Sequence, residues 1–212
     1  RQDWILPAVG ILVGAHFLPW ARVFEYPVYY GTGGVEIVSL GGVVSSGLIA
    51  SGGRVLLTGG GTALNAVLSG GSLEQQSGSV VTGLSWLSGT LQLDSGVTSS
   101  GLKVQGTSET LVLSGGTASG TSVSNSGSVV VSSGGTASGM TVSSGGSLTV
   151  DAGGTAIAIT VFSHGSLTVA SGGTAGNTVM SGGKLDVEAG AVVSGAITLF
   201  GSAPAVLLID GS

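Results

Sequence analysis

The chain has 212 residues, 42 of them glycine, with 7% charged residues and a formal net charge of −5. So few Lys and Arg exclude nucleic acid as a partner, because binding to its backbone needs clustered basic residues. The absence of cysteine excludes disulfides and thiolate metal sites. A hydrophobic fraction of 42% argues against disorder, and glycine without a three-residue period excludes collagen.

Residues 1–33 form an apolar N-terminal segment that lacks the pattern of the rest of the chain. The stretch from Trp4 to Trp20 has the minimum length for a transmembrane helix and is flanked by arginines, but two prolines and a histidine interrupt it. Three interpretations stay open: a segment derived from a membrane protein, a cap over the first coil of the next domain, and a targeting remnant. Any membrane contact is expected through residues 1–30 alone.

Residues 34–212 are predicted to form one repeat domain. Gly-Gly-Thr-Ala occurs at 115–118, 134–137, 153–156 and 172–175, each copy nineteen residues after the last. A solenoid returns to the same turn at a constant interval, because each repeat is one coil that stacks on its neighbour. The fixed step therefore predicts a solenoid.

The residues between the turns predict strands. Residues 147–150 and 166–169 both read Ser-Leu-Thr-Val, which alternates polar with apolar side chains as a half-buried strand does. Ser-Gly-Gly and similar groups separate these segments and supply turns. Two or three short strands fill a coil of about nineteen residues, and no useful helix fits between them.

Two apolar positions keep step with the repeat and predict columns of buried side chains. The first recurs at Val123, Val142, Val161 and Val179. The second recurs at intervals of 18–20 residues at Ile37, Val55, Leu73, Leu91, Leu111, Val129, Leu148, Leu167 and Leu185. The fold class that follows is an all-β, right-handed parallel β-helix of about 9–10 coils of 18–20 residues, with a degraded last coil around residues 205–209.

No catalytic, cofactor-binding or metal site is predicted. His164 falls in a turn, where histidine is an ordinary surface residue. Asp186 and Glu188 alternate on one strand and share a face, but no third ligand recurs in adjacent coils. No Gly-x-Ser-x-Gly elbow is present, and three basic residues beyond residue 33 cannot build the charged groove of a polysaccharide-degrading β-helix.

The repeat at residues 132–150 reads Ser-Ser-Gly-Gly-Thr-Ala-Ser-Gly-Met-Thr-Val-Ser-Ser-Gly-Gly-Ser-Leu-Thr-Val. It resembles the nineteen-residue repeat of AIDA-type autotransporter adhesins, and the resemblance extends over about residues 34–200. It implies a secreted passenger on the bacterial surface, associated with the outer membrane, that mediates adhesion to host-cell surfaces or glycans, self-association and biofilm formation. An inert stalk and, less favoured, a carbohydrate-active β-helix enzyme stay as alternatives.

The same resemblance implies O-glycosylation of repeat serines with heptose by a dedicated transferase. No leader and no C-terminal translocator are recognisable, so the chain is expected to be a fragment or an orphan copy. The serines that match the repeat best are Ser132, Ser133, Ser138, Ser143, Ser144 and Ser147.

Overall fold

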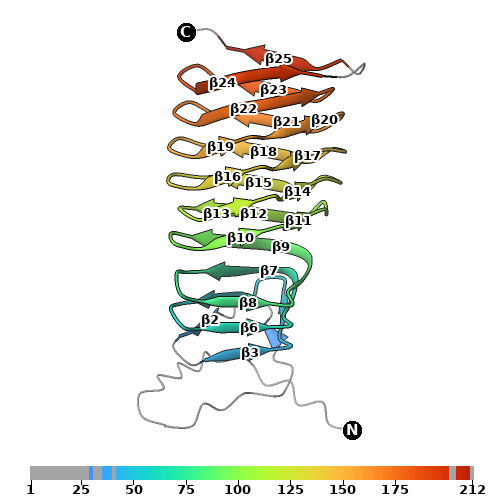
Figure 1. Cartoon of the computed structure of the whole chain (residues 1–212). Helices are drawn as coiled ribbons and strands as arrows, with labels where there is room; N and C mark the ends of the chain where they lie inside the picture. Colours follow the sequence, from blue (N-terminus) through green and yellow to red (C-terminus); the bar gives the residue numbers. More distant parts are fainter. Residues whose placement is uncertain (1–28, 31–34, 40–41, 201–203, 211–212) are drawn as a thin grey trace.

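The computed structural model describes residues 29–30, 35–39, 42–200 and 204–210. Within these residues every regular element is a strand, and the strands stack coil upon coil into a rod (Figure 1). Neighbouring strands pair in parallel, and the paired strands come from successive coils. The predicted parallel β-solenoid is therefore confirmed. No helix in the described part is long and apolar enough to cross a membrane.

One 12-stranded sheet runs along the whole rod. Most of its strands stack in a single column from the first coil to the last, and the strands at its N-terminal end continue on a second face. Its strands are β1 (Tyr29–Tyr30), β2 (Val35–Val38), β4 (Leu48–Ala50), β5 (Arg54–Leu57), β7 (Val67–Gln75), β9 (Ser85–Asp94), β12 (Glu109–Ser114), β15 (Ser128–Val131), β18 (Ser147–Val150), β21 (Ser166–Val169), β23 (Lys184–Val187) and β25 (Val206–Ile209).

Two further sheets cover the remaining faces, and they do not join each other. The three-stranded sheet lies in the N-terminal coils and contains β3 (Val43–Ser45), β6 (Thr62–Leu64) and β8 (Val80–Thr82). The 10-stranded sheet covers the later coils and contains β10 (Thr98–Ser100), β11 (Lys103–Val104), β13 (Thr117–Ser119), β14 (Ser122–Val123), β16 (Thr136–Ser138), β17 (Thr141–Val142), β19 (Thr155–Ile157), β20 (Thr160–Phe162), β22 (Thr174–Ser181) and β24 (Val192–Leu199).

The two glycines of Gly-Gly-Thr-Ala have different structural roles. The first glycine adopts a left-handed backbone, with φ of +76° at Gly153 and +78° at Gly172, which costs an L side chain strain but glycine none. The second glycine lies against the coil beneath: a Cβ added at Gly173 would come within 2.5 Å of the Val150 carbonyl oxygen. The dipeptide therefore turns the chain and lets successive coils approach each other.

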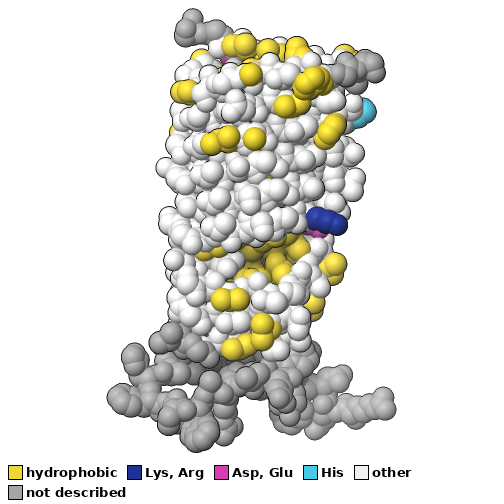
Figure 2. Space-filling view, viewed as in Figure 1, with side chains coloured by type: hydrophobic (Ala, Val, Ile, Leu, Met, Phe, Trp, Pro, Cys, Tyr) yellow, Lys and Arg dark blue, Asp and Glu magenta, His cyan; other side chains and the backbone are white. Residues whose placement is uncertain are grey.

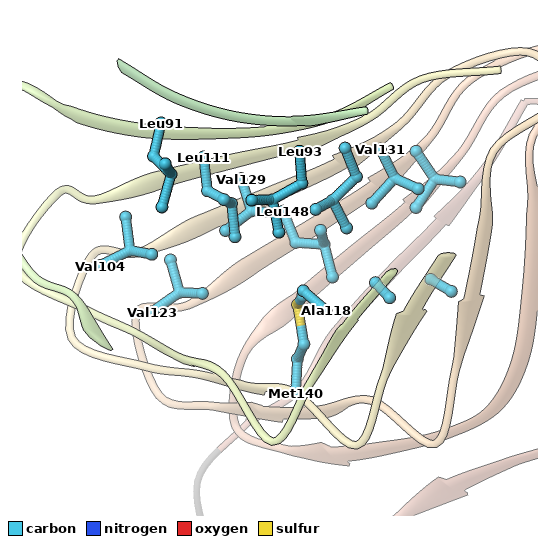
Figure 3. Close-up of a cluster of buried hydrophobic side chains, with 14 of the residues drawn as sticks. Leu91, Leu93, Val104, Leu111, Ala118, Val123, Val129, Val131, Met140 and Leu148 are labelled. Carbon is cyan, nitrogen blue, oxygen red and sulfur yellow. The ribbon is translucent and has the colours of Figure 1, made fainter. Parts of the chain in front are cut away.

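The core is a narrow file of apolar side chains along the axis of the rod. In each regular coil the alternating residues of the three strands point inward, as Leu148 and Val150 do from β18. The predicted second column is continuous in register from Val55 through Leu185. Figure 3 shows Leu91, Leu111, Val129 and Leu148 in this column, with Val104, Val123, Ala118, Met140, Leu93 and Val131 packed around them.

For two residues the predicted place in a column is wrong by one position. Ile37 pairs with Leu56 rather than Val55, and its side chain is 57% exposed. In the first column Val161 pairs with Met180, which is fully buried, and not with Val179. The coil from Leu167 to Leu185 is one residue shorter than the coil before it, and the missing residue falls in the turn after β22. Met180 lies before that turn, so it is still nineteen residues from Val161.

The last coil is stacked but uncovered. Strand β25 pairs with β23 and confirms the predicted coil around residues 205–209. All four of its residues are exposed, because among the described residues no strand pairs with its outer edge. At the other end Tyr29 and Tyr30 form β1, which pairs with β4. The remaining residues of the predicted N-terminal segment lie outside the described residues.

Candidate functional site

The candidate serines lie on the outer wall, which we define as the outward-facing side chains of the strands and turns between residues 110 and 188. Strand alternation builds this wall: Leu148 is buried, whereas Ser147 and Thr149 on either side of it are half-buried and face outward. The parallel register repeats the arrangement, so that Ser147 lies between the serines of β15 and β21. The wall therefore presents columns of hydroxyl groups that follow the rod.

The six serines sit within one coil and its turns. Ser138 and Ser147 lie on β16 and β18, and the other four lie in the turns after β15 and β17. Ser133 and Ser144 are exposed, whereas the remaining serines are half-buried. Ser144 also adopts φ of +48°, a left-handed turn conformation that places it at the tip of its turn. The structure gathers these hydroxyls on the exterior of the rod.

His164 and the acidic pair have structural surroundings. His164 is exposed in a turn with φ of +63°, at the position that Gly145 takes one coil earlier. Asp186 accepts a hydrogen bond from Lys184 Nζ at 2.8 Å, and Glu188 is exposed beyond the end of β23. Within the described residues no group of three or more His, Cys, Asp or Glu side chains converges as metal ligands would.

A shallow polar cleft on the N-terminal half of the rod escaped the sequence analysis. It has a volume of about 540 Å³, and Gln92 Nε2 donates to Asp94 Oδ1 at 2.8 Å within it. Long polar side chains in place of Ser and Thr were its signal in the sequence. Amides, a carboxylate and hydroxyls together can hold a polar ligand by hydrogen bonds. The lining residues are Gln76, Ser77, Gln92, Asp94, Ser95 and Ser114.

An ion pair lies on the same face one coil earlier. Arg54 donates to Glu74, whose side chain is only 12% exposed, while that of Arg54 is 52% exposed. The hydrogen bond to Glu74 and the charge of that carboxylate raise the pKa of Arg54 above its ordinary value. The pair therefore neutralises a largely buried carboxylate. It does not leave a free charge for chemistry.

Comparison with known proteins agrees with the repeat. Residues 133–183 match a family described as adhesin of bacterial autotransporter system, probable stalk. The chain is also similar to the crystal structure of a TibC-catalysed hyper-glycosylated TibA fragment, with 26% identity, 88% of each chain covered and a TM-score of 0.39. No curated protein matches the chain. The family match confirms the AIDA-type repeat that the sequence predicted.

Proposed function

We propose, from the AIDA-type stalk repeat of residues 133–183, that this chain is part of the passenger of a bacterial autotransporter adhesin displayed on the cell surface. In this proposal the chain is not an enzyme. Its function is mechanical and adhesive: the rod carries a long wall of hydroxyl groups that contacts an identical rod or the surface of a host cell, and such contacts between cells build a biofilm.

The wall itself supports this proposal. The columns around Ser147 and Thr149 repeat coil after coil, so two rods laid side by side can form the same contact many times. Each hydrogen bond contributes only about 1 kcal/mol net. The affinity of one rod for another therefore comes from the number of such contacts along their length. The wall also carries little charge, so that two copies repel each other weakly.

Self-association is tested by analytical ultracentrifugation of the purified chain over a range of concentrations. We expect reversible association, and we expect glutamates in place of the exposed Ser133 and Ser144 to weaken it by repulsion between facing walls. A chain with Val80→Glu, an exposed position outside the outer wall, is the matched control. A strictly monomeric chain at every concentration would refute the self-association part of the proposal.

Glycosylation of the six repeat serines is part of the same proposal. The TibA fragment is glycosylated by TibC, and a transferase of that kind needs accessible hydroxyls. Ser133 and Ser144 meet this need best, because they are exposed in turns, while Ser132, Ser138, Ser143 and Ser147 are half-buried.

Mass spectrometry of the chain co-expressed with TibC tests the modification. We expect heptose on Ser133 and Ser144 before the other four serines. Alanine at Ser133 and Ser144 should then remove the earliest modified species. An unmodified chain would count against glycosylation and leave the adhesive wall to be judged by the association experiment.

A purely supporting stalk is the second candidate, because the matched family is described as a probable stalk. In that case the rod separates another domain from the cell and has no adhesive surface of its own. Bacteria that display the rod alone distinguish the two: clumping or binding to host cells supports the adhesin, and neither activity supports the stalk.

A further inference from the structure

Strand pairing between successive coils is interrupted at one level of the solenoid. Strand β8 ends the three-stranded sheet and β10 begins the 10-stranded sheet, although they occupy equivalent positions in successive coils. Residues 85–88 of β9 likewise have no partner in β11. Among the described strands only the 12-stranded sheet continues across this level, through the pairing of β9 with β12. We name this interruption, between residues 80–88 and 98–104, the breach (Figure 1).

Both sides of the breach present free strand edges. Elsewhere the corner amides link successive coils, as when Gly101 N donates to Ser119 O and Gly120 N donates to Ser138 O, both at 2.9 Å. Gly83 is the equivalent residue one coil earlier, and its amide has no such bond. In the described structure no backbone hydrogen bond joins residues 80–88 to residues 98–104. Such edges are ready templates for another strand.

The floor of the breach is apolar. Leu84, Trp86 and Leu102 are only partly buried there and pack against the core. In later coils the position of Leu102 is taken by Met140 and Ile159, which are fully buried. Figure 2 shows hydrophobic side chains exposed in a hollow of the rod's surface, between smoother parts above and below it. The hollow has a volume of about 330 Å³, and Leu84, Trp86, Gly101, Leu102 and Lys103 line it.

The rim of the breach carries the positive charge of Lys103, which no carboxylate in the described part of the chain pairs with. Of the basic side chains in the described part of the chain, Arg54 pairs with Glu74 and Lys184 pairs with Asp186. Lys103, on the edge strand β11, is exposed and forms no salt bridge with any described carboxylate. A ligand in the breach would therefore gain from a negative group near Lys103.

We propose that the breach binds one extended peptide strand of a partner protein, with apolar side chains at alternate positions and a carboxylate near Lys103. Two facing strand edges require an occupant with regularly spaced N–H and C=O groups, which an extended backbone provides. Its inward side chains cover Leu84, Trp86 and Leu102, and its acidic side chain meets the Lys103 ammonium group. This inference concerns a different surface from the hydroxyl wall and does not depend on self-association.

The experiment uses the full chain and a short synthetic peptide that alternates valine with threonine and carries one glutamate. We expect binding to change the fluorescence of Trp86 and to slow amide exchange in residues 80–88 and 98–104, while residues 136–142 stay unchanged. Trp86→Phe identifies the fluorescence signal, since the chain has three tryptophans. A peptide with proline at its centre is the control for backbone pairing, because proline lacks the amide hydrogen.

The charge is tested by Lys103→Glu, which we expect to weaken peptide binding at least tenfold, with Lys184→Glu as the control that leaves binding unchanged. Both variants should keep the wild-type circular dichroism, since both side chains are substantially exposed. Equal binding of the proline peptide, or unchanged binding by Lys103→Glu, would overturn the proposal. So would concentration-dependent protection of residues 80–88 and 98–104 without any peptide, because the occupant would then be a second copy.

Discussion

Thr121 lies directly beneath Met140 in a corner of the solenoid: the Thr121 carbonyl accepts a hydrogen bond from Thr141 N, the amide next to Met140, at 2.9 Å. Both side chains are fully buried, yet the Thr121 hydroxyl has no hydrogen-bond partner among the residues that the structure describes. Further along the same column Ile159 is apolar, and Thr178 again buries an unpartnered hydroxyl. The column accepts apolar residues, and its two threonines carry a desolvation cost.

Thr121→Val is therefore expected to stabilise the rod. Valine has nearly the same shape and removes the unpartnered hydroxyl, whose burial costs about 1–3 kcal/mol. Chemical denaturation followed by circular dichroism should show a higher midpoint than that of the wild type. Thr149→Val on the outer wall is the control, since its hydroxyl faces outward. A lower midpoint for Thr121→Val would show that the hydroxyl is satisfied in solution.

Leu148→Ala is expected to destabilise the coil by about 2–5 kcal/mol, the usual cost of a cavity at a fully packed leucine. Leu148 is 1% exposed and is paired in register with Val129 below and Leu167 above. Thr149→Ala, next to it but on the outer face, should cost less than about 1 kcal/mol. The same denaturation experiment compares the two. Equal losses for both variants would contradict the inward orientation of the leucine column.

Gly173→Ala is expected to cost about 1–3 kcal/mol, because the new methyl group would press on the carbonyl of the coil beneath and force the two coils apart. Gly120→Asn is the matched control. Gly120 has φ of +59° and no close neighbour, and Asn65 and Asn177 occupy equivalent corners with φ of +51° and +50°.

The control variant should change stability by no more than about 0.5 kcal/mol. Thermal melting of both variants checks the pair. If Gly120→Asn proved as damaging as Gly173→Ala, the distinction between turn glycines and contact glycines would be wrong.

Arg54→Gln is expected to cost about 1 kcal/mol, at the upper end for a partly exposed pair, because it leaves the largely buried Glu74 carboxylate without its cation. Lys184→Gln should cost less, since the side chain of Asp186 is twice as exposed as that of Glu74. Denaturation at low and high salt measures both, and salt should reduce the difference.

The pH dependence of the Arg54 contribution has a definite sign. Glu74 raises the pKa of Arg54 above its ordinary value, so the contribution is fully present below that ordinary value and is lost only as pH rises through the folded pKa. The stability difference between wild type and Arg54→Gln should therefore not change with the charge of Arg54 between pH 6 and pH 9. A loss of the difference within this range would point to another titrating group.

The regular coils could be predicted from the sequence because one physical requirement repeats in each of them. A leucine or valine at the position of Leu148 must meet its equivalents above and below, so its spacing alone identifies the column. Ile37 and Val179 were misassigned because an apolar residue next to the true position satisfies the same pattern. Which of the two neighbouring residues belongs to the buried column is decided by the register of the backbone pairing, because both side chains are apolar.

The breach could not be predicted in this way. The step of twenty residues from Leu91 to Leu111, the longest in that column, lies in the coil that forms one side of the breach. The step shows that a coil is irregular, but it does not show which of the three faces opens. That depends on how β9 continues as one strand through residues 85–94 and turns from one face to the next at Gly89, a tertiary outcome of its pairing with β7.

The interruption between β8 and β10 also has a mechanical consequence. A rod resists bending through the material on all its sides, and at this level a single side is continuous, along β9 and β12. Bending stiffness is therefore lowest at this level. The parts of the rod before and after the breach tilt most easily about the continuous side formed by β9 and β12. Whatever fills the opposite side would straighten and stiffen the rod, so that the angle between its halves reports occupancy.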